Sequence, residues 1–199
     1  NSTIDQNEIV FNWIGGSSVV IYEVHHMYQD VGSDDSYTRH GDPEVYNARY
    51  YLTDGKAPTV NMPKPQATAG YKYADRYKTN NDANNQDLTL KLPTAEQKGL
   101  IIELYYDRET YDYSVKYVDE NNIPIVVDPD VTPIVTGTGR YLDKLTVGTV
   151  VKDIHIPGYK LINGSDEVSL TYNNQVIECR YQKQSATYNY RVIGSGGQS

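Results

Sequence analysis

The 199-residue chain contains only one cysteine, one tryptophan and one phenylalanine. Because Cys179 has no partner cysteine, no disulfide can form within the chain, which excludes the small disulfide-stapled scaffolds. No stretch approaches the roughly 18 consecutive apolar residues of a membrane-spanning helix. We therefore expect no membrane insertion of this segment and a fold held together by packing and hydrogen bonds.

Positive charge is also scarce. The 18 Lys and Arg residues face 26 Asp and Glu residues, which gives a formal net charge of −8. A surface that follows a phosphate backbone needs clustered Lys and Arg. The charge balance therefore argues against nucleic acid as a partner.

The common catalytic patterns are missing as well. The sequence has no Ser/His/Asp set, no phosphate-binding loop and no dinucleotide fingerprint. Asp and Glu are abundant, but no pair stands out in an apolar setting, as the two carboxyl groups of a glycosidase would. We predict that the protein is not an enzyme.

Tyrosine, by contrast, is abundant, with 20 residues, and it marks an internal repeat. The strand-like stretch 22–30 recurs as 111–119, at an offset of 89, and in truncated form as 188–192. Recurrence at a domain-sized spacing is typical of tandem arrays.

Two further landmarks keep the same order along the chain. Gly70-Tyr71-Lys72 recurs as Gly158-Tyr159-Lys160, at an offset of 88. The later stretch 100–106 recurs as 176–181, at an offset of 75 that equates Leu104 with Cys179. The repeat predicts these divisions: 1–18 as an N-terminal extension or the end of a preceding copy, 19–109 as the first copy, 110–185 as the second, and 186–199 as the start of a third copy with a tail.

The hydrophobic pattern has the period of two that is typical of strands. Val20, Tyr22, Val24, His26 and Tyr28 share one face of the first stretch, which we expect to be the core face. Helical patterns are poor, so we predict a mainly β fold, of the α+β type with little helix. The stretch 149–156 is predicted as a strand, and 94–98 as a helical turn or two.

The landmarks together resemble the mucin-binding protein (MucBP) repeat of Gram-positive surface proteins, related to internalin B-type repeats. The resemblance rests on residues 113–124, on Ile156-Pro-Gly-Tyr-Lys-Leu161 and on 176–181, with 26–30, 69–71 and 104–108 in the first copy. It implies two β-grasp-like (ubiquitin-like) domains in tandem, elongated, and displayed outside the cell on a bacterial cell wall. It implies host mucin or glycoprotein glycans and neighbouring repeats as partners, and it carries no catalytic residues.

Single residues that could suggest chemistry have simpler explanations. Cys179 falls on an inward face, where a structural thiol is expected rather than a nucleophile. His25 and His26 are adjacent on a strand, so their side chains point to opposite faces and cannot share one metal ion. The acidic stretches 30–35, 82–87 and 128–130 have oxygens for calcium, but solvated turns explain them better. No cofactor is therefore expected, and no sequence rule picks a pair for a Lys-to-Asn cross-link.

Tyrosine side chains are the remaining candidates for a site. Tyr105 lies on the polar face of its strand, while Tyr50, Tyr71, Tyr73 and Tyr77 crowd one part of the first copy. Exposed rings can stack on the apolar face of a sugar. The other explanation is that these rings cover edge strands and pack between repeats. The leading hypothesis is an adhesin fragment that attaches to mucin glycans; the alternative is a passive stalk or spacer.

Overall fold

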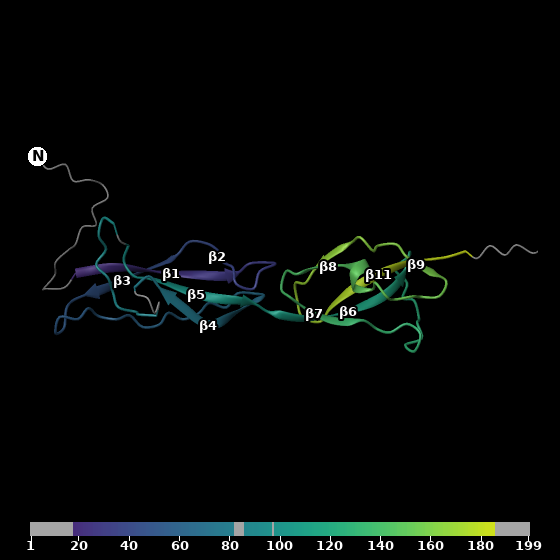
Figure 1. The fold of residues 1–199 in the computed structure, drawn as a ribbon, viewed down its shortest axis with the longest axis horizontal. Helices are drawn as coiled ribbons and strands as arrows, with labels where there is room; N and C mark the ends of the chain where they lie inside the picture. The colour runs from purple at the N-terminus through teal and green to yellow at the C-terminus, as the bar shows by residue number, and fades with distance from the viewer. Residues whose placement is uncertain (1–17, 82–85, 97, 186–199) are drawn as a thin grey trace, which may run out of the picture. The chain divides into compact units, whose positions relative to one another are not determined.

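The computed structural model describes residues 18–81, 86–96 and 98–185. The chain divides between Glu109 and Thr110 into two compact units, called here unit 1 and unit 2 (Figure 1). No helix in the described residues is long and apolar enough to cross a membrane.

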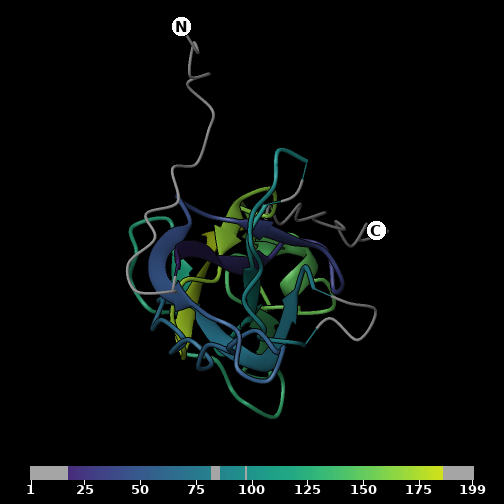
Figure 2. The same cartoon turned by 90° about the vertical axis from the view of Figure 1, so that its left-hand side faces the viewer.

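Unit 1 is built on one mixed β-sheet. Its strands are β1 (Ser18–Gln29), β2 (Tyr37–Arg39), β3 (Glu44–Tyr50), β4 (Tyr71–Thr79) and β5 (Ile101–Arg108). The central strands β1 and β5 run parallel, and β4 pairs antiparallel with β5. On its other side β1 pairs antiparallel with β3 along its first half and with β2 at its end (Figures 1 and 2).

Unit 2 repeats this arrangement with shorter outer strands. Its elements are β6 (Thr110–Asp119), β7 (Thr136–Arg140), β8 (Lys144–Thr146), α1 (Val147–Val150), β9 (Tyr159–Leu161), β10 (Glu167–Ser169) and β11 (Gln175–Lys183). The main sheet has the order β7-β6-β11-β9, with β6 and β11 parallel in the centre. A second small sheet joins β8 and β10.

The predicted mainly β fold is confirmed, since every helix or strand among the described residues is a strand apart from the four-residue α1. The β-grasp assignment stays a prediction. The helical turn predicted at 94–98 is wrong, because the described part of that stretch forms bends. The strand predicted at 149–156 is also wrong, because α1 begins at Val147 and turns follow it.

The alternation of side chains places the two cores as predicted. In β1, Val20, Val24, His26 and Tyr28 are buried and Tyr22 is half-buried, whereas Val19 and Ile21 are exposed. The core of unit 1 adds the following side chains from the later part of the unit: Leu90, Leu100, Ile102, Leu104 and Tyr106. The core of unit 2 consists of Val115, Tyr117, Val147, Val151, Ile156, Ile177, Cys179 and Tyr181.

The pairing of the two central strands differs between the units by two residues from what the sequence offsets predict. In unit 1, His26 lies opposite Leu104. The sequence offsets equate these two residues with Val115 and Cys179, yet Cys179 lies opposite Tyr117 instead. The first strand has therefore moved by two positions against its parallel neighbour. Because side chains alternate with a period of two, this shift keeps every residue on its predicted face.

Candidate functional site

Four of the five candidate tyrosines belong to the core of unit 1 rather than to a free surface. Tyr50, Tyr71, Tyr73 and Tyr77 are half-buried and pack against its buried residues. Tyr71 meets the ring of Tyr28 edge-on, with 5.0 Å between ring centroids. Partial burial of this kind supports the packing explanation for these four residues.

Tyr105 lies on the opposite face of the sheet, as predicted, but it is not exposed. Only 8% of its surface is accessible. The ring of Tyr37 meets it edge-on at 5.2 Å between centroids, and the cationic groups of Arg76 and Lys78 lie over it. The expectation of an open tyrosine is therefore wrong, because neighbouring strands supply a cover of aromatic and basic side chains.

This cover defines a polar aromatic surface, called here the Tyr105 cluster. Its members come from β2, β4 and β5 and are Tyr37, Arg76, Lys78, Glu103, Tyr105 and Asp107. The guanidinium carbon of Arg76 lies 4.8 Å from the ring centroid of Tyr37 and 4.6 Å from that of Tyr105. One cation thus covers two rings, a contact that electrostatic attraction to the ring faces stabilises.

An irregularity in β4 brings Arg76 to this position. The ladder between β4 and β5 shifts between Tyr73 and Tyr77, so that extra residues of β4 face Tyr105. Within this bulge Asp75 has a φ of 50°, a left-handed conformation that Asp tolerates better than most residues. Bulges re-aim side chains, and this one places Arg76 over the rings.

The two carboxylates of the cluster are held by tyrosine hydroxyls. Tyr105 donates to Glu103 Oε2 and Tyr37 donates to Asp107 Oδ1, both at 2.7 Å. Burial, followed by these hydrogen bonds, raises the pKa of both tyrosines, so the hydroxyls remain donors at neutral pH. Among the described residues, Arg76 enters no carboxylate ion pair, and its side chain is exposed.

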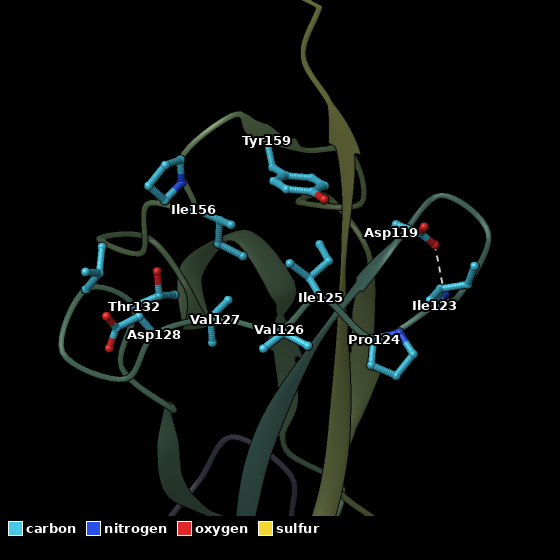
Figure 3. Close-up of a pocket in the computed structure, with 12 residues that line it drawn as sticks. Asp119, Ile123, Pro124, Ile125, Val126, Val127, Asp128, Thr132, Ile156 and Tyr159 are labelled. Atoms are coloured by element: carbon cyan, nitrogen blue, oxygen red, sulfur yellow. Dashed lines mark hydrogen bonds between the residues drawn. The ribbon is translucent and has the colours of Figure 1, made fainter.

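Unit 2 carries a separate hollow, called here the unit 2 pocket, of about 440 Å³ (Figure 3). In Figure 3 the side chains of Ile156 and Tyr159 lie above the chain that runs from Pro124 to Asp128. The remaining lining residues are Asp119, Ile123, Val131, Thr132 and Pro157. The pocket is therefore mainly apolar, and its two acidic side chains are those of Asp119 and Asp128.

Cys179 is a structural residue, as predicted. Its side chain is completely buried in the core of unit 2, and burial raises the pKa of the thiol to about 11. A nucleophilic cysteine needs a thiolate and an approach from solvent. Cys179 has neither at neutral pH.

The histidine pair points to opposite faces, as predicted. His25 Nε2 lies 2.7 Å from Glu23 Oε2, and His26 Nδ1 lies 2.8 Å from the hydroxyl of buried Tyr106. The Tyr106 oxygen also accepts the Gln66 N–H at 2.9 Å. His26 is therefore part of a buried hydrogen-bonded network.

The acidic stretches show local hydrogen bonding where they are described. Asp30 accepts the hydroxyl of Ser36, and Asp128 accepts the N–H of Asp130 at 3.0 Å. Residues 82–85 of the stretch 82–87 lie outside the described residues. Among the described residues, no group of three or more His, Cys, Asp or Glu side chains is arranged to hold a metal ion.

A Lys-to-Asn cross-link finds no support in the contacts of Lys91, which lies close to two asparagines. Its Nζ donates to the main-chain oxygens of Asn80 and Asn81, at 2.7 Å and 3.4 Å. Both acceptors are main-chain oxygens rather than side-chain amides.

Sequence reasoning found Tyr105 but missed Tyr37 and Arg76. Tyr37 belongs to a strand of only three residues, too short to show a period. Alternation along β4 places Arg76 on the face opposite Tyr73 and Tyr77, but the sequence does not show that this face meets Tyr105, because the register shift between Tyr73 and Tyr77 decides which residue of β5 lies opposite. A further signal was Asp75, a residue type that tolerates a left-handed backbone.

The chain has similarity to known proteins in structure but not in sequence searches. No family model and no curated protein matches the chain. Among solved structures, the type 2 repeat of the mucus binding protein MUB from Lactobacillus reuteri is 14% identical with a TM-score of 0.23, and it covers 82% of this chain and 100% of its own. Mub-RV is also 14% identical, with a TM-score of 0.21, and covers 82% of this chain and 99% of its own.

Proposed function

We propose that this chain is a non-catalytic, extracellular part of a bacterial surface adhesin that attaches to the glycans of host mucin or other glycoproteins. The observation that carries the proposal is the Tyr105 cluster, in which Arg76 is stacked over Tyr37 and Tyr105 on the face of the sheet opposite the core. The sequence resemblance to MucBP repeats supports the same class of function.

The cluster has the chemical groups that a saccharide needs. Arg76 and Lys78 donate hydrogen bonds, Glu103 and Asp107 have free acceptor capacity, and the half-buried ring of Tyr37 offers apolar contact. The hydrogen bonds and ring contacts within the cluster hold these groups in place before a ligand arrives, which lowers the entropy cost of binding.

Weak binding at a single site is adequate for attachment by an array. We propose that residues 19–109 and 110–185 are tandem copies of one repeat. The same proposal assigns 186–199 to the start of a third copy with a tail, and 1–18 to an N-terminal extension or the end of a preceding copy. Linked copies raise overall avidity by ~10²–10⁴ where the geometry allows simultaneous contact. We propose also that the parent chain is attached to the bacterial cell wall.

The test is retention of the 199-residue chain on immobilised mucin. We expect Arg76→Gln and Tyr37→Ala to reduce retention by about tenfold, the effect of losing ~1.4 kcal/mol. Arg39→Gln is the matched control, since Arg39 is an exposed arginine on β2 of the same sheet. Equal retention of all four proteins would remove the cluster from the proposal.

A passive spacer is the second candidate, and one observation favours it. β5 ends at Arg108 and β6 begins at Thr110, so only Glu109 separates the strands of the two units. The N–H of Glu109 donates to the oxygen of Gly70 at 2.8 Å, which ties the connecting residue to unit 1. A spacer would show no retention on mucin, whether or not the cluster is intact.

A further inference from the structure

The stretch Ile123 to Val127, called here the 123–127 segment, lies beside β6 as an incomplete edge strand of unit 2. The N–H of Asp119 donates to the oxygen of Ile123 at 2.8 Å, and the N–H of Ile125 donates to the oxygen of Tyr117 at 3.0 Å. Val118 and Pro124 form an isolated antiparallel bridge. One side of the segment is therefore paired with the sheet.

The other side of the segment is unpaired. Because main-chain groups alternate along an extended chain, the polar groups of Pro124 and Val126 point away from β6. Neither the oxygen of Pro124 nor the N–H and oxygen of Val126 enters a hydrogen bond among the described residues. A row of free donors and acceptors of this kind is a template for another strand.

The side chains beside this edge are apolar and open to solvent. Val126 is 97% exposed and Ile123 is 59% exposed, which is unusual for branched aliphatic residues. The segment forms a wall of the unit 2 pocket, and the opposite wall contains buried Ile156 and the ring of Tyr159 (Figure 3). A volume of about 440 Å³ is large enough to receive side chains of a partner.

The charge of the pocket is acidic. Asp119 and Asp128 line it, and none of its lining residues is Lys, Arg or His. Asp119 Oδ1 already accepts the N–H groups of Asn121 and Ile123, both at 2.8 Å, whereas its second oxygen has no such bond among the described residues. The rim therefore favours a partner with a positive charge.

These features fit a peptide better than a saccharide. The hydroxyl of Thr132 donates to the oxygen of His155, and apart from the ring of Tyr159 and the two rim aspartates the walls are aliphatic, so the pocket has few hydrogen-bond donors for the oxygens of a sugar. An extended peptide supplies its own main-chain donors and acceptors to the free edge. It can also place alternate apolar side chains in the pocket.

We propose that the 123–127 segment and the unit 2 pocket bind an extended peptide of another protein by strand addition. Main-chain hydrogen bonds form with Val126 and with the oxygen of Pro124. Alternate apolar side chains enter the pocket, and a Lys or Arg of the peptide pairs with Asp119 or Asp128. This site is distinct from the Tyr105 cluster of unit 1 and does not depend on the glycan proposal.

The probe is a fluorescein-labelled peptide, Lys-Val-Thr-Ile-Thr-Val, with blocked ends, titrated against the 199-residue chain by fluorescence polarisation. Two forms of the peptide, N-methylated at alternate sets of amides, separate strand addition from simple apolar contact. We expect one form to lose binding at least about tenfold and the other to retain it, because only one set of amides faces the edge. Equal behaviour of the two forms, or no binding of the parent peptide, would overturn the proposal.

Variants of the chain test the same contacts. Val126→Pro removes the N–H at the free edge, and Asp128→Asn removes a rim charge while keeping an oxygen for Asp130. We expect at least about tenfold weaker peptide binding for the first and a few-fold weaker binding for the second, with mucin retention unchanged. The control is Val176→Lys, a change at an exposed valine of β11. Proline is not used at this position because it would damage a paired strand. Competition by mucin O-glycans at this site, with binding of the peptide unaffected by Val126→Pro, would assign the pocket to glycans instead.

Discussion

The guanidinium carbon of Arg76 lies 4.6 Å from the centroid of the Tyr105 ring. This contact joins a residue of the β4 bulge to a strand in the centre of the sheet. It buries the aromatic ring and leaves the charge at the surface. Tyr105 is thus a supporting residue, and Arg76 is an exposed group of the cluster.

Arg76 should contribute more to binding than to folding. Exposed cation–π contacts contribute about 0.5–1 kcal/mol, so we expect Arg76→Leu to lower the free energy of unfolding by no more than about 1 kcal/mol. Arg76→Lys should keep the charge but lose the planar contact with both rings. Urea titration with mucin retention on the same samples checks both points. A loss of several kcal/mol would show that Arg76 is a structural residue.

The hydroxyl of Tyr106 should be important for the core of unit 1. Tyr106→Phe leaves the Gln66 N–H and His26 Nδ1 without their partner. We expect a loss of about 1–3 kcal/mol in the free energy of unfolding, the range for unsatisfied buried polar groups. Tyr22→Phe is the control, because the Tyr22 hydroxyl enters no hydrogen bond among the described residues. If the two variants are equally stable, the network does not stabilise the fold.

Gly148 in α1 should not tolerate a side chain. A Cβ at this position would lie 2.7 Å from the main-chain oxygen of Gly164, which accepts the N–H of Gly148 at 2.8 Å. We expect Gly148→Ala to destabilise unit 2 by about 1–3 kcal/mol, as overpacking does. Thr149→Ala, at the exposed next position, should change stability by less than about 0.5 kcal/mol. Thermal unfolding followed by circular dichroism measures both.

Stability should fall at high pH because of Cys179. Burial raises the pKa of its thiol from 9.0 to about 11, so the folded state keeps the proton while the unfolded state releases it. The stabilising effect is complete below pH 9 and is lost as the pH rises towards 11, by roughly 2–3 kcal/mol for this shift. Urea titrations at pH 8, 9, 10 and 11 measure the slope. Cys179→Ala should be less stable than the wild type below pH 9, where the linkage effect is complete, and should show a shallower fall above it.

The same burial predicts an unreactive thiol. In the folded chain at pH 8, we expect a thiol reagent such as iodoacetamide to modify Cys179 only at the rate of unfolding. In urea the reaction should be complete within minutes. Rapid modification of the folded protein would contradict the buried position.

Alternation was sufficient to predict the two faces of β1 and the buried state of Cys179, because side chains in strands follow a strict period of two. It could not fix the register between strands. A shift of two residues leaves the pattern unchanged, and so the register of β6 against β11 differs from that of β1 against β5 while the predicted face of Cys179 was correct.

Features that depend on close contacts between distant residues could not be predicted. The stretch 149–156 is rich in β-branched residues, as strands are, but Gly148 packs against Gly164 and the chain turns as α1 instead. The Tyr105 cluster joins residues of three strands, and it depends on the bulge at Asp75. Local propensity carries no information about such contacts, since tertiary packing decides them.

In each unit the first and the last long strands are parallel neighbours: β1 with β5, and β6 with β11. The chain enters along one strand of each pair and leaves along the other, so tension on its ends pulls the two strands past each other along their axes. The hydrogen bonds between them then bear the load together in shear, rather than opening one by one as in a hairpin pulled from its open end. The pairing of the two terminal strands in each unit therefore opposes unfolding by a pulling force more than a hairpin geometry would.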